Sequence, residues 1–130
     1  MKAFFRALVE TGQVDYIDLS LWDVFKEPHE EEHQGKSLLK HFMDLPRGDV
    51  RVGAAGKIMS AGDVRKVIDA GCDFVLIGRA AILRHDFPKR VQADPDYTSP
   101  ETPVPAKHLA AEGVSPDFID YLRKTFKMVA

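Results

Sequence analysis

Short apolar segments recur along the chain and predict the strands of a sheet. Residues 14–20 (VDYIDLS) alternate in part between apolar and polar positions, and residues 50–55 form a short, largely apolar run. The run Phe74–Ile77 is apolar without alternation, which is typical of a parallel strand covered on both faces. We therefore expect three strands, at about 14–20, 50–55 and 74–78.

Segments with helical spacing precede and separate these strands. Residues 3–12, 38–43 and 60–71 each place apolar side chains three and four positions apart, as an amphipathic helix does. The alternation of helix and strand predicts an α/β fold, with a parallel sheet and right-handed crossovers. On the first helix the candidates for inward-facing side chains are Phe4, Leu8, Phe5 and Val9.

The composition changes after Arg90. Residues 94–105 contain four prolines and predict an irregular surface segment. Ser115-Pro116 is typical of a helix start, with serine at the N-cap and proline at the first helical position. We expect two domains, residues 1–92 with the βα units and residues 93–130 with the Pro-rich segment and a C-terminal helix. The apolar face expected to dock that helix consists of Phe118, Ile119, Leu122 and Phe126.

Composition narrows the class of protein. The 130 residues are 45% hydrophobic and 29% charged, with a net charge of −2, as in a soluble globular protein without electrostatic attraction to nucleic acid or acidic membranes. No apolar run approaches the roughly 20 residues of a membrane span, and no signal-peptide pattern is seen. The single cysteine, Cys72, cannot form an internal disulfide, which favours a cytoplasmic location.

Two glycine-containing turns are the residues at which we expect a ligand to bind. Gly56-Lys57 follows the second predicted strand, and Gly78-Arg79 follows the third. Neighbouring parallel strands end at the same edge of a sheet, so these turns should lie side by side. Exposed backbone N–H groups together with Lys57 and Arg79 predict a site for an anion, most naturally a phosphate.

The segment from Val50 to Pro88 resembles the end of the Old Yellow Enzyme family, specifically its bacterial NADH:flavin oxidoreductases. The resemblance is carried by AAGKI at 54–58, by AGCDFVLIGRA at 70–80 and by the DFP that follows. It implies the last three strands of a (β/α)8 barrel, the TIM barrel fold, which needs roughly 250 residues in full. It also implies FMN as cofactor and NAD(P)H as reductant. Gly56, Lys57, Gly78 and Arg79 would then hold the FMN phosphate.

The resemblance implies no catalytic residue in this chain. Family members carry their flavin-ring contacts, substrate-anchoring pair and proton-donating tyrosine on earlier strands, and Tyr16, Tyr97 and Tyr121 do not stand in that context. We therefore expect an FMN-dependent oxidoreductase that acts on an activated alkene or a similar small molecule, of which the isolated chain is an incomplete, inactive portion. Its expected partners are the missing N-terminal half of the barrel or further copies of the chain.

Two other functions stay open at this stage. Other phosphate-binding barrel enzymes use similar glycine turns on their last two strands. A non-catalytic remnant that acts by association is the second alternative, because three parallel strands leave two unpaired edges and an uncovered face.

Other conspicuous residues favour structural roles. His29–His33 matches the zinc pattern H-E-x-x-H, but Pro28 and Gly35 flank it and it contains no apolar residue for a buried helix face. A solvated loop is the better interpretation, so we expect no metal. Cys72 should be a small buried hydrophobe. Asp18, at the end of the first strand, could contact a ligand directly or accept a hydrogen bond from a residue that does, and we favour the second interpretation.

Overall fold

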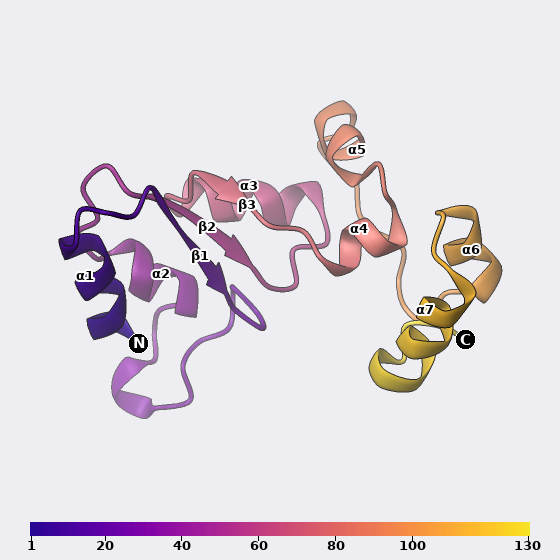
Figure 1. Ribbon diagram of the computed structural model, residues 1–130, viewed down its shortest axis with the longest axis horizontal. Helices are drawn as coiled ribbons and strands as arrows, with labels where there is room; N and C mark the ends of the chain where they lie inside the picture. Colours follow the sequence, from indigo (N-terminus) through magenta and orange to yellow (C-terminus); the bar gives the residue numbers. More distant parts are fainter. The chain divides into compact units, whose positions relative to one another are not determined.

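The computed structural model describes residues 1–130 as a mixed α/β chain with one small sheet. Strands β1 (Tyr16–Ser20), β2 (Arg51–Ala55) and β3 (Phe74–Val75) are parallel and lie in the order β1-β2-β3 (Figure 1). The register pairs Asp18 with Gly53 and Gly53 with Phe74. The expected parallel sheet is therefore confirmed, although β3 is shorter than the sequence suggests.

The chain divides into two compact units. The first comprises Met1–Ile58 and Gly62–Ile77, and the second Met59–Ala61 and Gly78–Ala130. The division between Ile77 and Gly78 lies inside residues 1–92, the first of the two predicted domains. The helical elements are α1 (Lys2–Glu10), η1 (Glu31–His33), α2 (Leu38–Met43), α3 (Ala61–Asp69), α4 (Arg79–Leu83), α5 (Phe87–Ala93), α6 (Ala106–Ala111), α7 (Pro116–Tyr121) and the π-helical η2 (Leu122–Phe126).

Helices cover one face of the sheet in the first unit. Leu19, Val52 and Ala54 are buried on this face, together with residues from α1, α2 and α3. On β1 the alternate residues Tyr16 and Asp18 point the other way and are exposed. One face of the sheet thus forms the core, whereas the opposite face at β1 meets solvent. The buried helical side chains of this core are Phe5, Leu39 and Val67.

The aromatic residue that helix α1 buries is Phe5, whereas Phe4 was also expected to face inward. Phe5 is buried and packs its ring 5.9 Å from that of Phe42, whereas Phe4 is 65% exposed. Leu8 and Val9 are half-buried, as the spacing predicts. The expectation for Phe4 was wrong because the inward stripe runs through residues 5, 8 and 9 and leaves position 4 outside it.

Gly53 lets an aromatic side chain cross the sheet. The Phe74 ring occupies the space that a Cβ on Gly53 would fill, and it meets the Tyr16 ring edge-on at a centroid distance of 5.9 Å. Glycine in a strand interior often marks such a close approach. The exposed face of the sheet therefore carries an aromatic pair that spans all three strands.

The second unit has its own apolar core. Ser115 caps α7, accepting a hydrogen bond from the N–H of Phe118 at 3.3 Å, so the predicted helix start is confirmed. Of the predicted docking face, Ile119 and Leu122 are buried, whereas Phe118 and Phe126 are each 41% exposed. The exposure of Phe126 follows from the π-helical η2, because the wider turn of a π-helix moves the Phe126 side chain out of line with the buried stripe. The core residues are Leu83, Val104, Leu109, Ile119, Leu122, Met128 and Val129.

Candidate phosphate-binding site

The Gly56-Lys57 turn has a backbone conformation that singles it out. Gly56 has φ +143° and Lys57 has φ +53°, so two consecutive residues lie at positive φ directly after β2. A Cβ on Gly56 would collide with the backbone carbonyl of Leu21. The turn is also bonded to the following loop, since the N–H of Val24 donates to the Gly56 carbonyl at 3.2 Å. Only glycine fits at position 56.

Lys57 is a non-glycine residue in the left-handed region, where L-residues are strained by roughly 1–2 kcal/mol. Such outliers concentrate at functional sites, where the surrounding structure holds them. The Lys57 ammonium lies 3.2 Å from the Asp23 carboxylate, and its side chain is 49% exposed. Asp23 in turn accepts a hydrogen bond from the N–H of Phe25 at 3.0 Å. The cation is thus held at the surface by an acid from the loop after β1.

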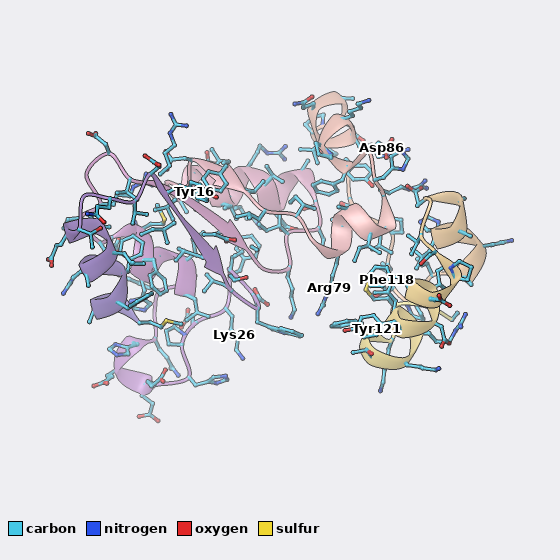
Figure 2. The ribbon with its side chains drawn as sticks, viewed as in Figure 1. Tyr16, Lys26, Arg79, Asp86, Phe118 and Tyr121 are labelled. Atoms are coloured by element: carbon cyan, nitrogen blue, oxygen red, sulfur yellow. The ribbon has the colours of Figure 1, made fainter.

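The Gly78-Arg79 turn opens the second unit. Gly78 is the N-cap of the short helix α4, and no atom lies within 4 Å of the place where its Cβ would be. The Arg79 guanidinium lies 5.9 Å from the ring centroid of Phe126, within the range of a cation–π contact. The Arg79 side chain, at the start of α4, is labelled in Figure 2. Nothing in the residue pattern indicated this contact, because Phe126 was expected to face the core.

The four predicted phosphate ligands therefore belong to two different units. Gly56 and Lys57 lie in the first, and Gly78 and Arg79 begin in the second. Both turns follow strands that are neighbours and parallel, as predicted. Their joint binding of one phosphate stays a prediction.

Asp23 is a site residue that sequence reasoning missed. It lies in the loop of residues 21–35, where nothing in the residue pattern distinguishes it from the other acids. Its pairing with Lys57 depends on the path of the loop, which is fixed by hydrogen bonds from Leu21 to the Ala55 carbonyl and from Val24 to the Gly56 carbonyl. Asp18 is exposed on the open face of β1.

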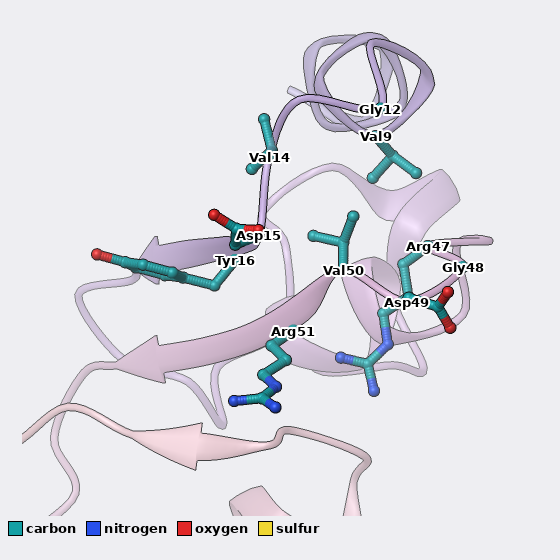
Figure 3. Close-up of a pocket in the computed structure, with 10 residues that line it drawn as sticks. All are labelled: Val9, Gly12, Val14, Asp15, Tyr16, Arg47, Gly48, Asp49, Val50 and Arg51. Carbon is teal, nitrogen blue, oxygen red and sulfur yellow. The ribbon is translucent and has the colours of Figure 1, made fainter.

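A hollow of about 680 Å³ lies at the other end of the strands, around the starts of β1 and β2 (Figure 3). Among the charged residues that line this hollow, Arg47 is already hydrogen-bonded within the fold. Its guanidinium donates to the Asp73 carboxylate at 2.6 Å and to the Gly71 carbonyl at 2.9 Å. Because it lies at the opposite end of the strands, the hollow is separate from the Gly56-Lys57 turn. Its lining consists of Val9, Gly12, Val14, Asp15, Tyr16, Arg47, Gly48, Asp49, Val50 and Arg51.

The HEEEH segment does not form the helix that a zinc-protease pattern requires. Only the three residues Glu31–His33 form a 3-10 turn. The His29 ring contacts the Lys26 ammonium at 2.9 Å, whereas the His33 ring lies 3.5 Å from Glu32. The two histidines thus have separate partners.

A cluster that sequence reasoning did not find joins His85, Asp86 and Glu112, whose ligand atoms lie within 4.8 Å of one another. Glu112 accepts from Arg84 at 2.7 Å, and from the backbone and ring of His85 at 3.0 and 2.7 Å. The His85 hydrogen bonds, aided by Arg84, lower the pKa of the Glu112 carboxyl. Asp86 is held by Arg90 at 2.8 Å. Because an arginine neutralises each carboxylate, we interpret the cluster as a set of stabilising contacts within the second unit.

Cys72 is buried, as expected. Burial raises the pKa of its thiol to about 11, so it is a neutral thiol at physiological pH. The interpretation as a small core residue is confirmed.

Comparison with known proteins gives no family. No protein-family model matches the chain, and no curated protein matches it significantly. In the structure, no helix is both long and apolar enough to cross a membrane.

Proposed function

We propose that this chain is the phosphate-binding portion of an FMN-dependent NAD(P)H oxidoreductase that resembles the Old Yellow Enzyme family. The observation that carries the proposal is the turn after β2, where Gly56 and Lys57 both take positive φ and only glycine fits. The backbone is held in a strained conformation at the carboxyl end of a parallel strand, where open α/β sheets bind their ligands.

The architecture supports a place in a larger barrel. A (β/α)8 barrel has parallel strands with helices on the outside only, and the first unit buries one face of its sheet in the same way. Strand β1 pairs only with β2, so its other edge is open to a preceding strand. On this proposal β1, β2 and β3 are the sixth, seventh and eighth strands.

The proposed role of this chain is to grip the cofactor rather than to transform the substrate. Bound flavin would supply hydride transfer, with NAD(P)H as its reductant. Backbone N–H groups at Gly56 and Gly78 would donate to the phosphate oxygens, and Lys57 and Arg79 would balance their charge. Lys57 would have to share its ammonium between the phosphate and Asp23.

Equilibrium dialysis with FMN tests the role of Arg79. Hydrogen bonds to a charged group contribute roughly 1.5–3 kcal/mol each, so Arg79→Ala should weaken FMN binding about ten- to a hundred-fold. Arg6→Ala, which removes an exposed arginine of α1, is the matched control and should change nothing. If both variants retain FMN equally and keep their circular dichroism spectra, Arg79 is not a phosphate ligand.

Association is the second candidate function, and one observation favours it. An apolar hollow of about 290 Å³ adjoins the open edge of β1, and two of its side chains are strongly exposed: Met1 at 91% and Phe4 at 65%. An added βα unit would pair its strand with β1 and cover these side chains. On this proposal the occupant is the N-terminal part of the barrel. Gel filtration of the chain with a polypeptide that carries that part should give a joint peak, and Phe4→Ser should abolish it.

A further inference from the structure

Trp22 is the single tryptophan of the chain and the most exposed of its phenylalanine, tyrosine and tryptophan side chains, at 70% exposed. It lies two residues after the end of β1, at the carboxyl end of the parallel sheet. Tryptophan is highly buried on average, because its ring system presents a large apolar area to water. Open α/β sheets bind ligands at this end of their strands. An exposed indole in this position therefore indicates a ligand contact.

The backbone on both sides of Trp22 runs directly over Gly56, in the predicted phosphate turn. A Cβ built on Gly56 would collide with the Leu21 carbonyl and would lie 3.1 Å from the backbone nitrogen of Asp23. These two residues flank Trp22 in the sequence. The base of the indole side chain is therefore close to the turn that is proposed to bind the phosphate, and all of these residues lie in the first unit.

The loop presents Trp22 from a fixed backbone. Val24 is fully buried, and its N–H donates to the Gly56 carbonyl at 3.2 Å. The Asp23 carboxylate accepts a hydrogen bond from the N–H of Phe25 at 3.0 Å, which closes a turn immediately after Trp22. A side chain that projects from a held backbone loses less entropy when a ligand binds, so this aromatic ring is pre-organised for contact.

We propose that the Trp22 indole stacks on the planar ring of a ligand whose phosphate is bound at Gly56 and Lys57. The site then selects phosphorylated compounds that carry an aromatic ring, the chemical class to which FMN belongs. This inference rests on the proposed function, because it takes the position of the phosphate from the turn after β2. The turn recognises the charged end of the ligand, and Trp22 recognises the apolar ring at the other end.

The indole also distinguishes an aromatic phosphate from a sugar phosphate. A sugar phosphate has the charged group but no planar aromatic face, so it gains no stacking contact from Trp22. Loss of a stacking side chain weakens the binding of an aromatic ring by roughly five- to a hundred-fold. The binding of FMN should therefore depend on Trp22, and the binding of a sugar phosphate should not.

Isothermal titration calorimetry on the full chain, with FMN and with ribose 5-phosphate, tests this selectivity. Trp22→Ala should weaken FMN binding roughly five- to a hundred-fold and leave ribose 5-phosphate binding unchanged, whereas Trp22→Phe should recover most of the FMN affinity. Tyr16→Ala, which removes an exposed tyrosine at the other end of the strands, is the matched control and should change neither affinity. Lys57→Ala should weaken the binding of both ligands, because it acts on the phosphate.

The outcomes separate this inference from the proposed function. If the natural chain and Trp22→Ala bind FMN equally tightly, the role of Trp22 is overturned and the phosphate site stands. A natural chain that binds neither ligand overturns both proposals.

The indole N–H resonance of Trp22 gives an independent readout, because a stacked ring shifts the magnetic resonance signals of the group beneath it. FMN should move this resonance upfield, and ribose 5-phosphate should leave it in place. FMN binding without such a shift would exclude the stacking contact.

Discussion

The ammonium of Lys57 lies 3.2 Å from the carboxylate of Asp23, so the cation proposed to hold a phosphate already has an anionic partner. Both residues lie within the first unit, in the loops that follow β2 and β1. The pair reduces the positive charge that the turn offers to an incoming anion. Asp23 should therefore oppose phosphate binding.

Removal of the Asp23 charge should strengthen FMN binding. A partly exposed pair of this kind is worth about 0.2–1 kcal/mol, so Asp23→Asn should tighten binding roughly 1.4- to five-fold. Lys57→Ala should weaken binding, and Lys107→Ala, at an exposed lysine of α6, serves as the control. Equilibrium dialysis at low and high salt measures both effects. If Asp23→Asn weakens binding, the loop acid supports the site rather than competing for Lys57.

Substitution of Gly56 should damage the fold of the first unit. Gly56→Ala adds a Cβ against the Leu21 carbonyl at φ +143°, and we expect a loss of more than about 2 kcal/mol in the free energy of unfolding. Gly35→Ala is the matched control, because Gly35 also has positive φ but no atom lies near its Cβ position. Urea unfolding should show a clearly larger loss for Gly56→Ala. Equal losses would mean that the close approach to Leu21 is not restrictive.

Asp73 should make part of the stability depend on pH. It accepts hydrogen bonds from the N–H of Val52 at 2.8 Å and from Arg47 at 2.6 Å, and these lower the pKa of its carboxyl below its ordinary value. A lowered folded-state pKa stabilises the fold above the unfolded pKa, and the contribution disappears as the pH falls through the folded value. The Asp73 side chain is 38% exposed, so we expect only about 1 kcal/mol at pH 7.

Asp73→Asn isolates this contribution. The difference in unfolding free energy between the natural chain and the variant should be constant from pH 7 to about pH 5 and shrink below pH 4. Asp69→Asn, at the exposed end of α3, should show no such trend. A difference that persists unchanged at pH 2 would show that shape, rather than the Asp73 charge, is responsible.

The strands could be predicted from sequence because each is a short apolar or partly alternating run, and the second and third are followed by a glycine-containing turn. The same patterns missed α4 and α5, since the short segments 79–83 and 87–93 contain too few residues to show a helical period. Phe4 and Phe126 were expected inside for a related reason. A stripe of apolar residues is consistent with two neighbouring faces, and tertiary packing chooses between them.

Only some residues of the candidate site could likewise be predicted from the sequence. Gly56 and Lys57 were recognisable from their position after an apolar run, and their positive φ values agree with a special turn. Asp23 and Phe126 could not be recognised in this way, because each contacts a residue that is distant in sequence. Asp23 pairs with Lys57, and Phe126 contacts Arg79. Periodicity reports on one element at a time and contains no such information.

The comparison of FMN with riboflavin tests the central claim most directly, because the two ligands share the flavin ring and differ in the phosphate. Quenching of flavin fluorescence on titration with the chain should show FMN binding about ten- to a hundred-fold more tightly than riboflavin. Inorganic phosphate should compete with FMN, and high salt should narrow the difference. Equal affinities for FMN and riboflavin, or no binding of FMN at all, would contradict the assignment of Gly56, Lys57, Gly78 and Arg79 as a phosphate site.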